Sequence, residues 1–313
     1  MILSACIIAK SASEELTRAV ASVRPHVDEV VLVWTGGESE ERPSTFEGVD
    51  AASHFTECNS EHACSGPCGC QPGDILDFAA ARNHALSRAH GDWSTWIDSD
   101  DVVVKTAAKS LRQVAHEASG PVLMPYAYCP DDGFFVPRLI PKGKTWVYPI
   151  HEFIPPPYAA RSDRSFTWQH VRTRERAVQS TLRNERILLH WREHPALQDD
   201  PRMLYFQGRS KVDLGKRVAA IRPLAKAFSL ERSPERRATV AMLLSRCFPP
   251  GLPGSDREAW AWEAVKAAPS WSKPWENLAV ILPKMVQAFT HVAKTLGPTP
   301  LESLAPFAWP KAS

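Results

Sequence analysis

Two apolar runs near the start of the chain constrain its fold most. Residues 2–9 (ILSACIIA) and 27–34 (VDEVVLVW) have the length of strands, and residues 12–23 between them repeat apolar side chains at helical intervals. Strands that read as continuous apolar runs are buried on both faces, and they alternate with helices in parallel sheets. The pattern predicts an α/β domain with a parallel sheet covered on both faces.

The alternation continues beyond these two runs. A loop-rich stretch at 36–61 is predicted to hold a short strand at 53–57. Helical spacing and strand-like apolar runs then follow in turn. The predicted helices cover residues 74–91 and 105–120, and the predicted strands cover 93–98, 121–128 and 133–140.

In the last third of the chain, paired helices replace the alternation. Helix openings near Pro201 and Glu235, and pair endings at Pro234 and Pro269, recur at about 34 to 35 residues, the tetratricopeptide period. Repeat arrays present binding surfaces. We therefore predict a tetratricopeptide-like tail, with a plain helical bundle as the alternative.

The change of pattern divides the chain into a domain over 1–185, with a Cys-rich insertion at 54–73, and a helical domain over 186–313. A net charge of +2 and a pI near 8.2 do not by themselves indicate binding to nucleic acid or to a membrane. No stretch approaches the roughly 18 apolar residues of a membrane span. The start MILSACIIAK lacks the basic opening of a signal peptide, so we expect a cytoplasmic protein.

Three carboxylates follow the apolar strand WSTWID: Asp98, Asp100 and Asp101. Ligands of parallel α/β sheets bind outside the carboxyl ends of strands. Two carboxylates one residue apart can converge there on a divalent cation that bridges nucleotide phosphates. The alternative is that Asp98 caps the following helix, and that Asp100 and Asp101 are solvated turn residues.

Several segments, in their order and spacing, resemble a known family. They are IIAK near the start, VDEVVLV followed by Thr35 and Gly36, DFAAARNHAL, and GDWSTWIDSDD. Together they are similar to family 2 glycosyltransferases of the GT-A fold. WVYPIHEF, His170, LRNERILL and DDPRMLYFQGRSKVDLG further resemble the subgroup with a C-terminal tetratricopeptide-like extension.

The resemblance implies a Rossmann-like GT-A domain that uses a nucleotide-diphospho-sugar donor and Mn2+ or Mg2+. Asp98 would lie near the ribose and the metal, and Asp100 would be the principal metal ligand. Asp77 and Arg82 would meet the nucleotide base and phosphates. Thr35 would line the nucleotide pocket.

One position departs clearly from the family pattern. Trp34 stands where an acidic residue usually follows the second strand. A Trp ring can stack on a base or ribose, but it cannot accept the hydrogen bonds that a carboxylate accepts. The identity of the nucleotide therefore stays open.

A transfer with inversion needs a base within hydrogen-bond reach of the acceptor, opposite the leaving diphosphate. Glu152 in YPIHEF is the candidate, because it resembles the family's H-E pair, and Asp101 is the weaker substitute. The alternative is that His151 and Glu152 form a structural ion pair.

His170 matches the later histidine of the family pattern and is the predicted third metal ligand, with His151 and His190 as competitors. Residues 161–192 hold eight Arg and three acidic residues, a net charge of +5 when histidines are neutral. A flexible basic segment beside the site could clamp the diphosphate. A nucleic-acid surface and a solvated basic face are the alternatives.

Four cysteines fall within the insertion: Cys58, Cys64, Cys68 and Cys70. They offer enough thiolates for a tetrahedral structural Zn2+ site, although their spacing is not that of a common zinc module. Free thiols and disulfides remain alternatives. Sugar transfer does not need this cluster.

The sequence therefore predicts a metal-dependent, inverting glycosyltransferase. A protein or peptide acceptor is favoured by the helical tail, and a modified DNA base or a saccharide is the alternative acceptor. The alternative of another class is a catalytically degenerate adaptor that binds a partner through its tail. A nucleotidyltransferase would also use acidic metal ligands.

Overall fold

The structure is a computed structural model, and it describes residues 1–36, 43–55, 74–129, 132–155, 161–170, 174–192, 194–249, 256–281 and 295. The chain divides into two compact units, Met1–Ala177 and Val178–Pro310. This division and the predicted boundary near residue 185 both fall within one helix, α4 (Arg174–Trp191). Each unit is described by itself.

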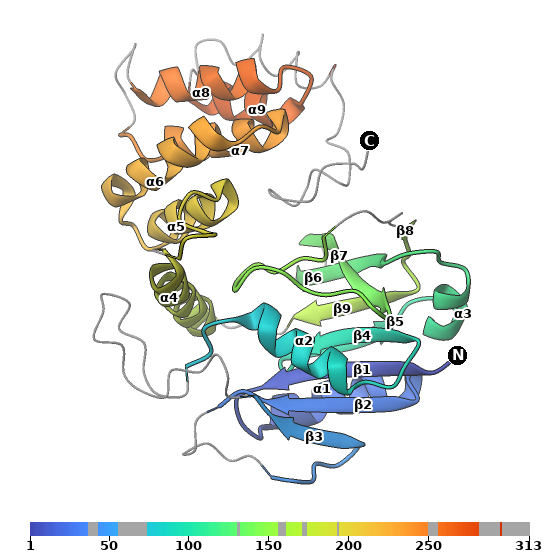
Figure 1. Cartoon of the computed structure of the whole chain (residues 1–313). Helices are drawn as coiled ribbons and strands as arrows, with labels where there is room; N and C mark the ends of the chain where they lie inside the picture. Colours follow the sequence, from blue (N-terminus) through green and yellow to red (C-terminus); the bar gives the residue numbers. More distant parts are fainter. Residues whose placement is uncertain are drawn as a thin grey trace. The chain divides into compact units, whose positions relative to one another are not determined.

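The first unit is built on one sheet, to which nine strands contribute within the described residues. Neighbouring strands follow the order β3-β2-β1-β4-β7-β6-β9-β5, and β8 pairs with β6 (Figure 1). The strands are β1 (Leu3–Ala9), β2 (Glu29–Trp34), β3 (Ala51–His54), β4 (Trp93–Asp98), β5 (Asp101–Lys105), β6 (Val122–Cys129), β7 (Asp132–Pro141), β8 (Arg161–Ser162) and β9 (Phe166–His170).

The sheet is wholly parallel in one half and mixed in the other. Strands β3, β2, β1 and β4 run parallel, as predicted, but β7 runs antiparallel to both β4 and β6. The predicted parallel sheet therefore describes the first half, whereas the second half combines antiparallel and parallel pairs. Strands β6 and β7 follow each other with only a short connection between Cys129 and Asp132, and such a connection allows an antiparallel pair but no crossover.

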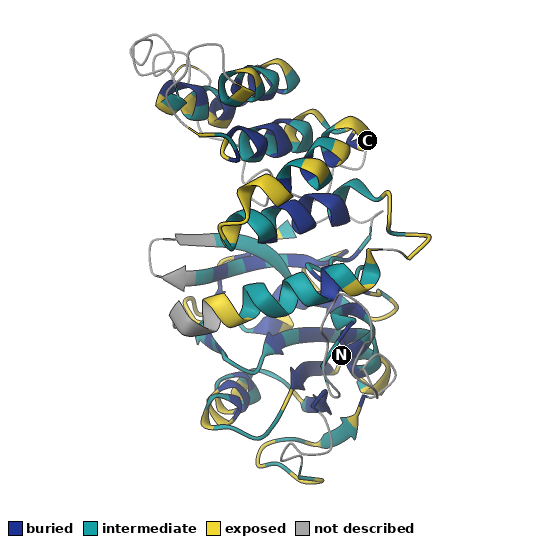
Figure 2. Cartoon of the chain, turned by 90° about the vertical axis from the view of Figure 1, so that its left-hand side faces the viewer, coloured by how far each residue is buried: buried dark blue, intermediate teal, exposed yellow. Residues whose placement is uncertain are grey.

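Helices cover both faces of the parallel half. The helical segments of this unit are α1 (Glu14–Val23), the 3-10 turn η1 (Arg24–His26), α2 (Phe78–Arg88) and α3 (Leu111–His116). Side chains alternate along β1, so that Ile7 packs in one apolar cluster with Leu16 of α1, and Ile8 packs in another with Ala81 of α2. The central strands are mostly buried, and exposed residues lie along helices and loops (Figure 2).

The segment after the carboxylates differs from its prediction. A helix was expected over 105–120, but β5 (Asp101–Lys105) comes first, and α3 begins only at Leu111. Ser110 caps α3 in a reciprocal capping box with Gln113. The strand forms because β5 pairs in antiparallel register with β9, a partner more than sixty residues away in sequence.

The second unit is helical in the part that the structure describes. Its helices after α4 are α5 (Pro201–Asp213), α6 (Arg217–Leu230), α7 (Pro234–Ser245), α8 (Asp256–Ala267) and α9 (Ser272–Ile281). Helices α5 and α6 pack together, as do α7 and α8, so the predicted pairs are present. The α/β domain followed by a helical tail is confirmed, whereas a tetratricopeptide type of repeat stays a prediction.

Close packing and capping hold the first helical pair in place. A Cβ atom on Gly208 of α5 would lie 2.3 Å from Cγ of Leu224 on α6, so only glycine fits there. Asp200 caps α5 by accepting a hydrogen bond from the Met203 amide, with Pro201 in the first turn. Among the described helices, none is long and apolar enough to cross a membrane.

Candidate functional site

The predicted carboxylates lie in the turn between β4 and β5. Asp98 ends β4 beside Ile8 of β1, and Asp101 opens β5 opposite His170, the last residue of β9. Asp100 lies in the tight turn between the two strands. The sheet register therefore brings together His170 and the three carboxylates, which local sequence alone could not show.

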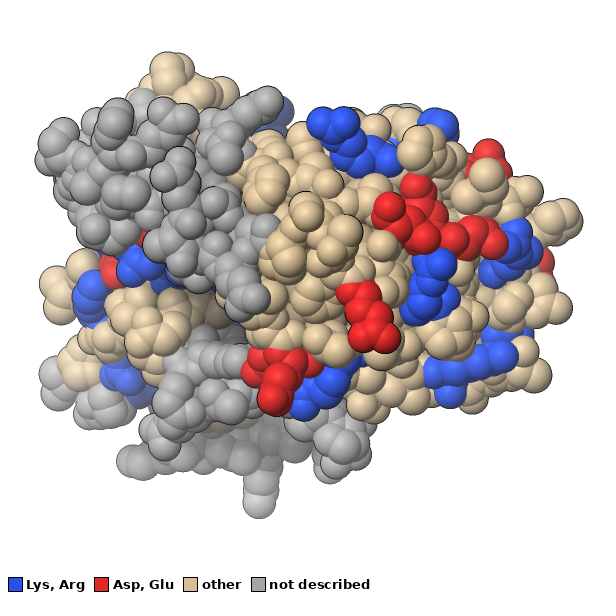
Figure 3. All heavy atoms as spheres, turned by 90° about the horizontal axis from the view of Figure 1, so that it is seen from below, with Lys and Arg blue, Asp and Glu red and all other residues tan. Residues whose placement is uncertain are grey.

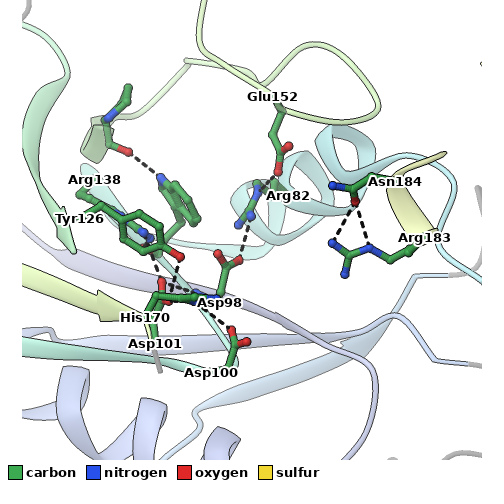
Figure 4. A network of polar contacts seen from close by, with 12 residues as sticks. Arg82, Asp98, Asp100, Asp101, Tyr126, Arg138, Glu152, His170, Arg183 and Asn184 are labelled. Carbon is green, nitrogen blue, oxygen red and sulfur yellow. Dashed lines mark hydrogen bonds and ion pairs between the residues drawn. The ribbon is translucent and has the colours of Figure 1, made fainter. Parts of the chain in front are cut away.

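Arg82 of α2 joins two of the predicted site residues. Its Nη2 donates to Oδ1 of Asp98 at 2.8 Å, and its Nε donates to Oε1 of Glu152 at 2.5 Å. Its guanidinium also lies over the ring of Trp96, 4.0 Å from the ring centre. Figure 4 shows Arg82 between the two carboxylates. Glu152 is thus paired with Arg82, and not with its neighbour His151 as the alternative reading of the sequence had it.

The electrostatics of this chain of contacts follow from burial and charge. Burial alone would lower the pKa of Arg82, but the carboxylates of Asp98 and Glu152 outweigh it and raise that pKa above its usual value. Burial would raise the pKa of Asp98, but the charges of Arg82 and Arg138 outweigh it, and the pKa falls. Asp98 is therefore an anion and Arg82 a cation at neutral pH.

Asp101 is an anchor of the fold. Its side chain is fully buried and accepts hydrogen bonds from Nη2 of Arg138 (3.2 Å), the hydroxyl of Tyr126 (3.1 Å) and Nδ1 of His170 (2.8 Å). Arg138 is itself fully buried against the ring of Trp96, 3.6 Å from the ring centre. The alternative that Asp101 is a solvated turn residue is wrong, because Asp101 opens a strand and is buried in an ion pair.

Among the described residues, the group that could hold a metal ion consists of Asp100, Asp101 and His170. One ligand atom from each lies within 4.8 Å of the others. Burial raises the pKa of Asp100, and the charges of Asp98 and Asp101 raise it further against the opposing effect of His170. The pKa of His170 is raised: burial lowers it, but the bond to Asp101 and the nearby carboxylates outweigh burial.

This crowding of like charges fits a divalent cation. Carboxylate oxygens and an imidazole nitrogen are ligands that Mn2+ takes, and carboxylates are ligands for Mg2+. A cation would offset the repulsion that raises the pKa of Asp100. Nδ1 of His170 lies 2.8 Å from Oδ1 of Asp101 and 3.6 Å from Oδ1 of Asp100, and a carboxylate bonded to a histidine ring fixes the orientation of a metal-ligating imidazole.

Asp77 and Thr35 have partners in the fold. Asp77 caps α2 by accepting a hydrogen bond from the amide of Ala80 at 2.8 Å. Burial raises its pKa, and the charge of Glu152 raises it as well. Thr35 is buried and its hydroxyl donates to the carbonyl of Ala9 at 3.2 Å. Contacts of these two residues with a nucleotide remain predictions.

Trp34 lies in the core and not in a pocket. Its ring is fully buried in the apolar cluster of β1 and α1, and Nε1 donates to the carbonyl of Pro43 at 3.1 Å. Phe46 packs against it edge to face, with ring centres 6.0 Å apart. Stacking of Trp34 on a base or ribose is therefore excluded in this conformation.

Other predicted residues belong to the second unit or lie outside the described residues. His190 belongs to the second unit, within α4, where its ring neighbours that of Trp191. Residues 161–192 are not one flexible segment, because their described part forms β8, β9 and α4. The cysteines of the predicted zinc site lie outside the described residues: Cys58, Cys64, Cys68 and Cys70.

Sequence reasoning missed three residues that organise the site: Asn83, Tyr126 and Arg138. Arg138 is the one charge within the apolar strand GFFVPRLI, and such a charge signals a buried partner. Asn83 follows Arg82 in the R-N pair of the family pattern. Tyr126 gave no signal that separates it from an ordinary core aromatic residue.

Comparison with known proteins now adds to this geometry. Residues 76–179 match the model of a family described as glycosyl transferase family 2. This segment contains the Arg82 contacts, the carboxylate turn and His170. The predicted family and GT-A fold class are confirmed for it.

Individual relatives are more distant. A TPR repeat-containing protein of Synechococcus elongatus is 30% identical over 110 residues, which are 35% of this chain and 23% of that protein. The chain thus spans about a quarter of that curated relative. Crystal structures of S. aureus TarS residues 1–349, free and in complex with UDP-GlcNAc, are 13% and 10% identical, with TM-scores of 0.42 and 0.44. Each match covers 92% of both chains.

Proposed function

From the place of residues 76–179 in glycosyl transferase family 2, we propose that the chain transfers a sugar from a nucleotide-diphosphate donor to an acceptor. The observation that carries the proposal is the chain of contacts from Glu152 through Arg82 to Asp98, beside Asp100 and His170. It joins in one unit a carboxylate that would act as the base, the Arg82 guanidinium, and the turn that would bind the metal. Asp101 anchors the fold, and that role does not require Asp98 and Asp100 at the same strand end.

Asp100 and His170 would hold Mn2+ or Mg2+, with Asp98 nearby for the ribose and the metal. The cation, when bound, neutralises the charge that develops on the leaving diphosphate. Arg82 keeps Asp98 ionised and oriented, because its guanidinium is fixed on both sides by carboxylates and below by Trp96. Asp101 holds His170 by its Nδ1.

Glu152 would act as the general base. Arg82 occupies its Oε1, and among the described residues its Oε2 has no hydrogen-bond partner. Oε2 would accept the acceptor's proton while the acceptor oxygen or nitrogen forms a bond to the anomeric carbon. The bond from that carbon to the diphosphate oxygen breaks, and the nucleoside diphosphate leaves with its electrons. Attack opposite the leaving group inverts the anomeric centre.

The acceptor is proposed from the helical tail. Helix α5 pairs with α6 and α7 with α8. Arrays of such helical pairs often present extended binding surfaces, which favours a protein or peptide. A modified DNA base or a saccharide is the alternative. On the face shown in Figure 3, Lys and Arg are interspersed with Asp and Glu and do not form one basic patch. A cytoplasmic location and a structural Zn2+ remain predictions.

The experiment is a donor screen. The protein is incubated with a panel of sugar nucleotides, UDP-GlcNAc among them, and Mn2+, and release of nucleoside diphosphate is measured. We expect release with at least one donor, loss on adding EDTA, and at least about a 100-fold loss in Asp100→Ala. Asp92→Asn, an exposed Asp of the same segment, is the control and should retain activity.

Two results would count against the proposal. Asp100→Ala as active as the wild type would remove the metal-binding turn from the mechanism. No release with any donor would favour the non-catalytic adaptor, which the burial of Trp34 at an acidic family position also favours. Pyrophosphate release from a nucleoside triphosphate would instead indicate a nucleotidyltransferase.

A further inference from the structure

The turn that carries Glu152 has an unusual backbone. Val147 and Phe153 pair as an isolated antiparallel bridge, with N···O distances of 2.9 and 3.2 Å. Between them, Tyr148 has φ = 75° and His151 has φ = 52°. These two are the described non-glycine residues with positive φ. We call residues 146–153 the Glu152 turn.

This conformation is strained. Positive φ brings Cβ too close to the backbone, so that residues other than Gly rarely adopt it, with Asn, Asp and His the commonest exceptions. Tyr148 also precedes Pro149, and a residue before proline is normally restricted to extended values with negative φ. Strain of this kind persists only where the surroundings enforce it, and it concentrates at functional sites.

Helix α2 supplies the enforcing contacts. Oδ1 of Asn83 accepts a hydrogen bond from the amide of Trp146 at 2.7 Å, and Nδ2 of Asn83 donates to the carbonyl of Trp146 at 2.9 Å. The first amide of the helix, from Phe78, donates to the carbonyl of Pro149 at 2.9 Å. One side chain thus satisfies both backbone groups of the residue that opens the turn.

Arg82, the neighbour of Asn83 on α2, holds the other end of the turn through Glu152. Side chains at adjacent helix positions point about 100° apart. Asn83 can therefore bond to the backbone of the turn while Arg82 bonds to the Glu152 carboxylate. Burial of Trp146 and Ile154 in an apolar cluster with Ala79 of α2 completes the contact. The position of the Glu152 carboxylate therefore depends on α2 at four places: Phe78, Ala79, Arg82 and Asn83.

We propose that Asn83 is a positioning residue for Glu152. By clamping Trp146, it keeps the Glu152 turn in its strained form, and this form directs the carboxylate to Arg82 and to the acceptor. The proposal rests on the proposed function for its catalytic consequence. Its structural part, the hold of Asn83 on the turn, stands on the contacts alone.

Catalysis is sensitive to such positioning, because a displacement of about 1 Å can cost about 100-fold in rate. A residue with a merely structural role would lower stability without acting through Glu152. The two roles therefore separate in a double-mutant cycle between Asn83 and Glu152.

The test has two readouts on the full-length chain. Amide hydrogen exchange of residues 146–153 is compared in the wild type, Asn83→Ala and Asn83→Asp. We expect exchange at Trp146 and Phe153 to rise at least about 10-fold in Asn83→Ala. Asn83→Asp keeps the acceptor oxygen for the Trp146 amide, so the rise should be smaller at Trp146. Unchanged exchange in both variants would overturn the proposal whatever the activity of the protein.

The second readout is turnover with a donor that the wild type uses. We expect Asn83→Ala to lower kcat about 10- to 100-fold with the KM for the donor within about 2-fold. In the Glu152→Gln background the same change should alter kcat by less than about 2-fold. Full and independent losses in both backgrounds would contradict action through Glu152.

Ser110→Ala is the matched control. It removes a side-chain hydrogen bond to a backbone amide in the same unit, at the start of α3, and should leave kcat and exchange of the Glu152 turn unchanged. Loss of kcat in this control equal to that of Asn83→Ala would attribute the effect to general destabilisation. A wild type without turnover would contradict the proposed function, and exchange would still decide whether Asn83 holds the turn.

Discussion

At the scale of single residues, neighbouring carboxylates have different environments and therefore different tasks. Asp101 is fully buried between Arg138, Tyr126 and His170, whereas Asp100 is partly exposed, with a raised pKa. The residue types and their spacing predicted a cluster of acids at a strand end. They could not show that Asp101 is buried, because its partner Arg138 lies 37 residues away in sequence.

The first prediction compares these two residues. Asp101→Asn leaves the buried Arg138 guanidinium without its counter-charge, and should lower the free energy of unfolding by about 3 kcal/mol or more. Asp100→Asn removes a partly exposed charge that its neighbours disfavour, and should change stability by no more than about 1 kcal/mol. Urea denaturation of both variants beside Asp92→Asn measures this. Equal losses in the two variants would contradict the division of tasks.

At the scale of elements, local patterns correctly predicted the segments whose conformation does not depend on a distant pairing partner. The apolar runs of β1 and β2 and the capped helix α5 formed where expected. Residues 101–105 formed a strand instead of a loop and the start of a helix, because pairing with β9 decided their conformation. Trp34 looked like a ligand-stacking residue, since its position at a strand end did not reveal that Phe46 would cover it.

The second prediction concerns the amino-terminal ends of β1 and β2. There, Glu29 of β2 connects β1 with the segment around His90. It accepts hydrogen bonds from the hydroxyl of Ser4 (2.5 Å) and the amide of His90 (2.9 Å), and its other oxygen lies 2.7 Å from Nδ1 of His90. Burial would raise the pKa of Glu29, but the bonds to Ser4 and His90 outweigh it, and the pKa falls below 4.5.

Because the folded-state pKa of Glu29 is depressed, its stabilisation is present above pH 4.5 and is lost as the pH falls through the folded value. Glu29→Gln should therefore lower the free energy of unfolding by about 1 kcal/mol at pH 7. The difference from the wild type should shrink in acid below that range. Urea midpoints at several pH values measure it, with exposed Glu47→Gln as the control. A difference that does not depend on pH would contradict the assignment.

At the scale of the whole molecule, the chain combines a sheet unit that carries the site with a helical unit of paired helices. The fold class and the family were predictable, because strand and helix periods and the spacing of motifs survive in one sequence. The residues of the site were predictable, but the contacts between them were not. The hold of Arg82 on both Asp98 and Glu152 spans 16 and 70 residues of sequence.

The proposed function gives different steps to two parts of the site, with Asp100 on the metal side and Glu152 on the acceptor side. The most direct measurement is donor binding and turnover of the wild type, Asp100→Asn and Glu152→Gln over a range of Mn2+ concentrations. We expect Glu152→Gln to bind donor and Mn2+ as the wild type does, with kcat lowered at least about 100-fold. Asp100→Asn should need at least about 10-fold more Mn2+ for donor binding. Full turnover in Glu152→Gln, or an unchanged Mn2+ requirement in Asp100→Asn, would contradict the account.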